Sequence, residues 1–261
     1  MRLLCWDEPT PGRPFVRAAL AAVAVAWLSG CGGHVLPEIH SDADRLSTAR
    51  RLRDQGSYLD ATELLKTYIS SSSGTAQVDE AVYLLGDCYL RQKEWALAVN
   101  EFERLGRDYP ESDSSAAAAF RLAEAYFGQS RREDFDQGYT HRALEQFQSY
   151  LRGHPGHWLN AQAERRVMEV RTRLARKLLG TGGLYLKLGF WEPARVYYRQ
   201  VVEEYGDTAS RTEADLGLAL VDAREGKRAE AIAQLREIET RYAHLPVARR
   251  AARERQRLER K

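Results

Sequence analysis

The feature that most constrains the fold is a pattern of helical spacing that recurs around a small residue. One alanine marks the pattern in each of five stretches: Ala61, Ala98, Ala143, Ala194 and Ala231. The intervals between these alanines are 37, 45, 51 and 37 residues. Apolar residues around them follow steps of three or four, which is typical of amphipathic helices. A repeat of this length predicts stacked helical units that bury their apolar faces only against their neighbours.

The second of these units shows the pattern most completely. Counted from Asp79, its large residues stand at positions 4, 7, 11, 17 and 24: Val82, Leu85, Tyr89, Trp95 and Phe102. Gly86 and Ala98 are the small residues, at positions 8 and 20. This closely resembles the tetratricopeptide repeat, where small residues lie at the crossing of two hairpin helices. We therefore expect an all-α fold class, a tetratricopeptide-repeat solenoid of about five helical hairpins, with the weakest matches in the terminal units.

Two of the four intervals exceed 37 residues, by 8 and by 14. The first excess falls at residues 130–139, which are polar enough for a surface loop inside repeat three. The second falls at residues 158–179, where apolar residues continue at helical steps. Fourteen residues are about four helical turns, so we expect a long helix leading into repeat four. The predicted organisation is repeats 1–3 in residues 42–156, repeats 4–5 with the long helix in 157–248, and a basic tail in 249–261.

The amino-terminal residues have the pattern of an export signal. Arg17 precedes an apolar run, residues 18–28, that is too short to span a bilayer as a stable helix. The run ends in Leu28-Ser29-Gly30-Cys31, which resembles the lipobox of bacterial lipoproteins.

The lipobox resemblance implies a lipid anchor. Residues 1–30 would be a lipoprotein signal peptide, Cys31 would carry the acyl chains, palmitate among them, and residues 31–41 would be a flexible linker. Gly32 stands where an aspartate would signal retention in the inner membrane, which favours the outer membrane. An ordinary secretory signal with a chance cysteine is the alternative.

Composition excludes several classes of function. The 39 basic and 37 acidic residues leave a net charge of +2, which provides no overall field for binding nucleic acid. A mean hydropathy of −0.53 excludes a polytopic membrane protein. The sequence has no nucleophile elbow, metalloprotease motif or phosphate loop. We therefore expect no enzyme activity, no cofactor and no metal site.

Three features resemble functional motifs but are better explained by structure. The run Gly180-Thr181-Gly182-Gly183 lacks the Lys-Ser/Thr pair of a phosphate loop, so it predicts a close approach between helices. His154 and His157 flank a turn without a neighbouring carboxylate or thiol, so solvated turn residues are favoured over a metal site. Cys88 falls on the packed side of a helix, which indicates a buried structural thiol.

The first helices of stacked hairpins usually line a groove that binds peptides. Positions 5, 9 and 12 of the first three repeats face this groove, and Leu46 is the first of these nine residues. The other eight are the candidates for peptide contact: Arg50, Arg53, Tyr83, Asp87, Leu90, Phe120, Glu124 and Phe127. Their aromatic rings and mixed charges suit a peptide with aromatic or apolar anchors. Acidic side chains at two of the three positions 9 argue against a clamp for a terminal carboxylate. The alternative is that these side chains only pack between adjacent helices.

The carboxyl-terminal residues, 249–261, hold seven basic and two acidic residues. A solvated, partly frayed helix is the prediction for this tail, and contact with anionic lipid head groups is the alternative.

Two stretches of the chain, residues 125–155 and 172–208, resemble the BamD family of outer-membrane assembly lipoproteins, also called ComL/YfiO. The resemblance extends over the whole chain after Cys31, with an enlarged third repeat and a long helix before the fourth. The sequence departs from the family at residues 70–74, a serine-rich run in place of Tyr-Pro, and at Gly206, which replaces a proline.

The resemblance implies a non-catalytic scaffold, lipid-anchored to the outer membrane at its periplasmic face. It implies two partners: the barrel-forming, BamA-like assembly subunit at the carboxyl-terminal repeats, and unfolded outer-membrane protein segments at the amino-terminal repeats. No nucleic acid partner is expected. The alternative is a tetratricopeptide lipoprotein that serves cell-wall synthesis, secretion or pilus assembly.

Overall fold

The computed structural model describes residue 39 and residues 41–71 and 77–260. The predicted signal peptide, Cys31 with its predicted lipid and most of the predicted linker lie outside the described residues, as does most of the serine-rich run. The compact unit described below comprises residues 40–261.

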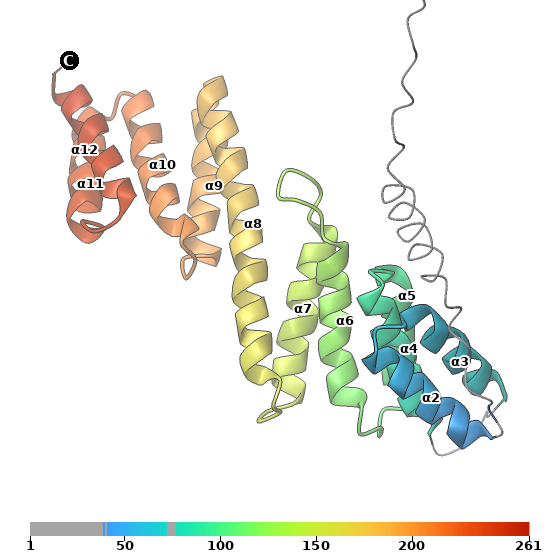
Figure 1. Ribbon diagram of the computed structural model, residues 1–261. Coiled ribbons are helices and arrows are strands. Elements are labelled where there is room, and N and C mark those ends of the chain that lie inside the picture. The colour runs from blue at the N-terminus through green and yellow to red at the C-terminus, as the bar shows by residue number, and fades with distance from the viewer. Residues whose placement is uncertain (1–38, 40, 72–76, 261) are drawn as a thin grey trace, which may run out of the picture. The chain divides into compact units, whose positions relative to one another are not determined.

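The described residues form eleven helices and no strand, in the order shown in Figure 1. The helices are α2 (Asp42–Asp54), α3 (Tyr58–Ser71), α4 (Val78–Arg91), α5 (Trp95–Asp108), α6 (Ser115–Gln129), α7 (Gly138–Gly153), α8 (Asn160–Leu188), α9 (Trp191–Glu204), α10 (Ser210–Arg224), α11 (Arg228–Arg241) and α12 (Pro246–Glu259). Each helix packs against the next one along the chain, so α2 to α11 make five successive hairpins. The predicted all-α tetratricopeptide-repeat fold is therefore confirmed.

Small residues lie at the helix crossings, as the repeat pattern predicts. All five marker alanines have no exposed surface. A Cβ added to Gly86 would lie 2.6 Å from the ring of Phe102, so α4 and α5 approach closely at this point. The same holds around Tyr198 of α9, which would meet a Cβ on Gly182 at 2.9 Å and one on Gly217 at 2.6 Å. The prediction that the glycine run of α8 permits a close approach is confirmed at Gly182.

The turns inside four hairpins place one residue in the left-handed backbone region. Gly56, Gly189 and Gly226 occupy this position with φ between +84° and +86°. Lys93 takes the equivalent position in the second hairpin, with φ of +63°. Glycine has no Cβ to clash there, which explains its use in three of the four turns.

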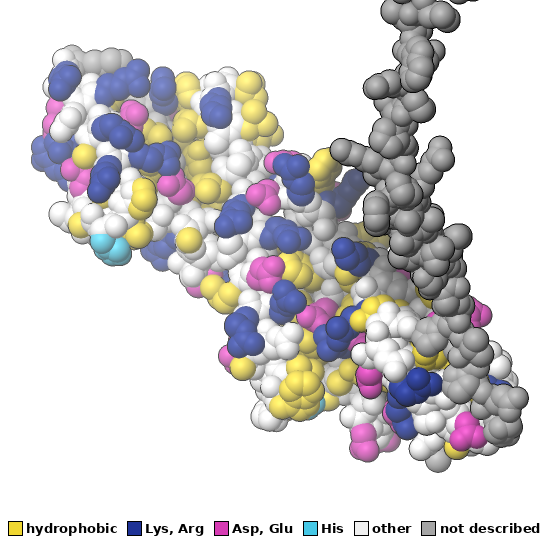
Figure 2. Space-filling model, viewed as in Figure 1, with side chains coloured by type: hydrophobic (Ala, Val, Ile, Leu, Met, Phe, Trp, Pro, Cys, Tyr) yellow, Lys and Arg dark blue, Asp and Glu magenta, His cyan; other side chains and the backbone are white. Residues whose placement is uncertain are grey.

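The two insertions lie where the spacing predicts. Residues 130–137 connect α6 to α7 without helix, and α8 extends over 29 residues before the left-handed turn at Gly189. α8, α10 and α12 lie side by side, as do α2, α4 and α6. Figure 2 shows basic and acidic side chains interspersed over one face of these helices, in agreement with the small net charge.

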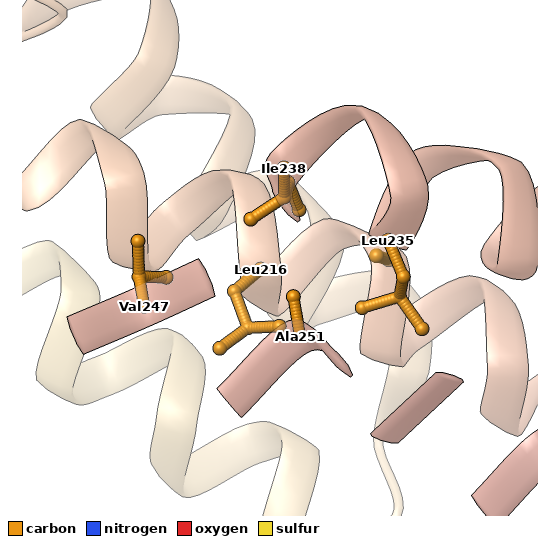
Figure 3. Packing of buried hydrophobic residues seen from close by; sticks show 6 residues of the cluster. Leu216, Leu235, Ile238, Val247 and Ala251 are labelled. Carbon is orange, nitrogen blue, oxygen red and sulfur yellow. The ribbon is translucent and has the colours of Figure 1, made fainter. Parts of the chain in front are cut away.

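Residues 249–261 differ from the predicted solvated, partly frayed helix, because most of them belong to a packed helix. α12 begins at Pro246 and packs on α11 and α10. Its buried residues join a cluster with the last hairpin, drawn in Figure 3: Leu216, Ala219, Leu235, Ile238, Val247 and Ala251. The apolar residues of α12 recur at steps of one helical turn, a stripe that the count of basic residues conceals.

Candidate peptide-binding face

The predicted peptide-binding face lies on α2, α4 and α6, with α4 in contact with both of the others. Two hollows adjoin there and share Arg53 and Tyr83 in their linings. The larger, of about 490 Å³, extends along α2 and α4 past Arg50 and Glu80 to Ser114. The smaller, of about 270 Å³, is open to solvent and is lined by seven residues: Arg53, Asp54, Tyr58, Tyr83, Asp87, Arg91 and Arg121. We call these two hollows together the amino-terminal groove.

Asp87 belongs to the lining of the smaller hollow and is 4% exposed. Three arginines surround its carboxylate: Arg53 at 3.9 Å, Arg91 at 3.7 Å and Arg121 at 3.9 Å. These distances exceed a hydrogen bond, and buried Oδ1 of Asp87 has no hydrogen-bond partner among the described residues. The attraction is therefore between charges alone. The lining of the smaller hollow thus holds three arginines and two carboxylates, Asp54 and Asp87. Arg53 also donates hydrogen bonds to Asp54, and Arg121 donates to Glu124. Among the described residues, Arg91 forms no hydrogen bond to a carboxylate and is the arginine left available to a ligand.

Arg50 is bound to Glu80 of α4 and not to Asp87. Its Nε donates to Oε1 of Glu80 at 2.6 Å, and its Nη2 donates to the other carboxylate oxygen. This paired geometry is typical of a strong arginine–carboxylate contact. Arg50 therefore joins α2 to α4 at the rim of the larger hollow rather than offering a free cation.

The prediction is wrong for Phe120, which does not line the groove. Its side chain has no exposed surface, and its ring centroid lies 5.6 Å from those of Phe147 and Tyr150 on α7. Aromatic pairs at this distance pack favourably in a core. The alternative interpretation, packing between helices, holds for this residue.

Side chains of α8 cover the two other candidates on α6. Arg166 of α8 donates to Glu124 at 3.1 Å, and Arg121 also binds this carboxylate. The guanidinium of Arg173 lies 4.3 Å from the ring centroid of Phe127. Both contacts come from the long helix, which the repeat frame alone does not place over α6.

The groove itself thus differs in part from the set predicted from the sequence. Tyr83 and Leu90 are partly exposed, and Tyr83 rests near Phe102 with 6.1 Å between ring centroids. The prediction missed Arg91, Arg121 and Tyr58, because it considered only three positions of each repeat. Arg91 follows Asp87 by four residues, a spacing that places opposite charges together on a helix. This spacing in the sequence indicates that Arg91 lies beside Asp87 on the groove.

The other motifs have structural roles. Cys88 is fully buried, and burial, together with the neighbouring Asp87, raises the pKa of its thiol to about 12. The thiol therefore stays protonated and is a poor nucleophile. His157 lies at the α7–α8 turn and contacts α7, with its Nδ1 2.6 Å from the hydroxyl oxygen of Tyr150.

The described part of the chain offers no group of three or more His, Cys, Asp or Glu side chains arranged to hold a metal ion. Over the same residues, no helix combines the length and the apolarity needed to cross a membrane.

Comparison with known proteins places this architecture in a family. A family model described as YfiO, outer membrane lipoprotein, matches residues 48–221. The chain belongs to the YfiO family. The match extends from α2 into α10 and so includes the whole amino-terminal groove of this YfiO member.

Two relatives in this comparison are both named outer membrane protein assembly factor BamD. The protein of Caulobacter vibrioides is 24% identical over 208 residues, which cover 78% of this chain and 68% of the relative. The protein of Vibrio cholerae is 24% identical over 222 residues, covering 78% of this chain and 92% of the relative. Among solved structures, a tetratricopeptide-repeat protein of Bacteroides fragilis is 13% identical with a TM-score of 0.47, over 85% of this chain and 99% of that one.

Proposed function

We propose that the chain is a non-catalytic scaffold lipoprotein of the machinery that assembles β-barrel proteins in the outer membrane. Membership of the YfiO family and the names of the two BamD relatives support this role. Lipid on Cys31 would hold the protein at the periplasmic face. The repeats would then present one surface to unfolded client segments and another to the barrel-forming, BamA-like subunit.

One observation supports client binding most directly: Arg91 lines the amino-terminal groove together with two tyrosines. Arg91 lies 3.7 Å from Asp87 and forms no hydrogen bond to a carboxylate among the described residues, and Tyr58 and Tyr83 line the same hollow. An unfolded β-barrel strand that ends in an aromatic residue brings a ring and a terminal carboxylate together. A guanidinium can bind such a carboxylate, and a tyrosine can pack on the ring.

This proposal revises the expectation that a terminal carboxylate would find no clamp. The expectation rested on acidic side chains at positions 9 of the second and third repeats. In the structure, basic groups reach the groove from other positions, namely Arg53, Arg91 and Arg121. The groove can therefore accommodate the charge of a chain end.

A peptide titration tests the client site. The probe is a synthetic ten-residue peptide of alternating apolar and polar residues with a carboxyl-terminal phenylalanine. We expect the double variant Tyr83→Ala, Arg91→Gln to bind it at least tenfold more weakly in fluorescence anisotropy, because a hydrogen bond to a charged group contributes about 1.5–3 kcal/mol. Amide capping of the peptide should weaken its binding to the wild type in the same direction.

The matched control is Tyr139→Ala, Arg228→Gln, which removes the same residue types from exposed positions outside the groove. It should bind the peptide as the wild type does. Equal affinity of the groove variant and the wild type, with the helical circular dichroism of both intact, would eliminate the groove as the client site.

A further inference from the structure

Exposed apolar side chains gather where α8 turns into α9. Leu184, Leu188, Phe190 and Val196 are 55–59% exposed. Figure 2 shows hydrophobic side chains over this end of α8 and α9, which Figure 1 locates. We call these four residues the α8–α9 patch. Large apolar side chains grouped in this way usually mark an interaction site on a soluble protein.

The patch is held in shape by the chain itself. Tyr185 packs edge-on against Phe190, with 6.2 Å between centroids, and stacks on Tyr197 at 5.5 Å. The left-handed turn at Gly189 fixes the path from α8 into α9. A partner would therefore meet a preformed surface, which lowers the entropy cost of binding.

Gly180 continues the patch along α8 and has no packing role within the described chain. Gly180, Leu184 and Leu188 stand four residues apart, so they form one stripe on the helix. A Cβ added to Gly180 would meet nothing within 4 Å, whereas one on Gly182 would collide with Tyr198. Glycine is less favourable than alanine inside a helix. Close approach of a binding partner to the backbone would explain why a glycine stands at position 180.

A hollow of about 220 Å³ extends the surface beside this stripe. Gly180 and Leu184 belong to its lining, and the other wall includes Glu133 and Asp134 of the α6–α7 connection. The hollow and the patch are therefore continuous through Leu184. A flat lipid surface would leave such a hollow unfilled, whereas a shaped protein segment can fill it.

The rim of the patch carries basic groups without acidic partners. Arg176, Lys187 and Arg199 are exposed, and none forms an ion pair with any residue that the structure describes. Glu192 of α9 pairs with Arg195 at 3.6 Å. Glu133 and Asp134 line the same hollow as Arg176 without forming an ion pair with it, and Asp134 pairs with Arg132. The complement to this rim is a set of carboxylates around an apolar centre.

We infer that the α8–α9 patch binds an amphipathic helix of a protein partner. The helix would place apolar side chains over Leu184, Leu188 and Val196, a small residue opposite Gly180, and carboxylates toward Arg176 and Lys187. This inference rests on the proposed scaffold function and assigns one partner surface to the carboxyl-terminal half of the chain.

The test compares variants of the full-length lipoprotein isolated from detergent-solubilised membranes. Gly180→Leu fills the stripe from a position where an added Cβ meets no atom of the described chain within 4 Å, and Val196→Asp places a charge in the patch. Leu59→Asp is the matched control, because Leu59 is 74% exposed on α3, outside the patch. A photo-crosslinking residue at position 184 of the otherwise unchanged chain identifies the peptide in contact, through mass spectrometry of the crosslinked product.

We expect recovery of one protein to fall at least tenfold with each patch variant and to stay unchanged with the control. The crosslinked peptide of that protein should have apolar residues at helical spacing flanked by Asp or Glu. The melting temperature of Gly180→Leu should equal or exceed that of the wild type, so the loss cannot arise from unfolding.

Crosslinks to lipid alone, or equal recovery of every partner by all variants, would overturn the inference. A crosslinked peptide without the apolar and acidic helical pattern would overturn it as well. The proposed function has a separate readout, namely recovery of the barrel-forming subunit on the wild-type chain. The wild-type chain can therefore recover the barrel-forming subunit or fail to do so, whatever the difference between the patch variants and the control.

Discussion

At the scale of single residues, substitutions at two glycines in the second hairpin distinguish the effect of packing on stability from the effect of helix propensity. Gly86 lies against Phe102, whereas a Cβ added to Gly106 of α5 would meet nothing within 4 Å. We expect Gly86→Ala to lower the free energy of unfolding by about 1–3 kcal/mol through overpacking. Gly106→Ala should raise it by about 0.5–1 kcal/mol. Urea denaturation followed by circular dichroism checks both, and a shift of the same sign in the two variants would contradict the packing argument.

Arg171 and Asp207 give a residue-scale prediction about pH. Arg171 of α8 donates to both oxygens of Asp207, at 2.9 and 2.7 Å, after the end of α9. These hydrogen bonds hold the pKa of Asp207 below its usual value. The stabilisation is therefore complete above about pH 4, the unfolded pKa of aspartate, and is lost as pH falls through the lower folded value.

We accordingly expect Asp207→Asn to unfold more easily than the wild type at pH 7. Asp207 is partly exposed, so the difference should be small, about 0.2–1 kcal/mol. Thermal unfolding at pH 7 and at pH 2.5 provides the measurement, because the difference should shrink at the lower pH. A difference that grows on acidification would show that the sign of the linkage is wrong.

Residue positions in a repeat frame predicted the groove only in part. Asp87 and Tyr83 line it because α4 lies between two other first helices. Phe120 occupies an equivalent position to Tyr83, but two aromatic rings of α7 enclose it. The frame gives the direction of a side chain relative to its own helix. It cannot give the size of the side chains on the helix that follows.

At the scale of helices, the length of α8 could be predicted and the role of α12 could not. Fourteen extra residues with uninterrupted apolar spacing leave a longer helix as the simplest arrangement. For α12, the high charge of residues 249–261 outweighs its few apolar residues in any composition argument. The structure shows that Val247 and Ala251 are nonetheless buried against the last hairpin.

α12 should therefore act as the cap of the repeat array. We expect Val247→Asp to accelerate amide hydrogen exchange in α10, α11 and α12 and to leave α2 to α5 unchanged, because repeat units depend mainly on their neighbours. Hydrogen exchange measured by mass spectrometry resolves these segments. Arg253→Asp, at an exposed position of the same helix, is the control and should have little effect.

Uniform acceleration throughout the chain in Val247→Asp would mean that the array unfolds as a single unit. Protection equal to the wild type in α10 to α12 would mean that α12 contributes no cap. Either outcome would contradict the expected local effect.

At the scale of the whole molecule, the two proposed binding surfaces lie on different groups of hairpins. The amino-terminal groove is lined by mixed charges and tyrosines, whereas the α8–α9 patch is apolar with a basic rim. Long arginines of α8 connect the two groups by covering Glu124 and Phe127 of α6. A scaffold that holds a client segment and an assembly partner at once needs two such separate surfaces.

The most direct test of this scaffold role is isolation of the tagged, full-length lipoprotein from gently solubilised membranes of its own organism. We expect the barrel-forming assembly subunit to be recovered with it in stoichiometric amount, and Cys31→Ser to release the chain from the membrane fraction. Recovery of cell-wall, secretion or pilus components without the barrel-forming subunit, under conditions that preserve the assembly complex, would contradict it.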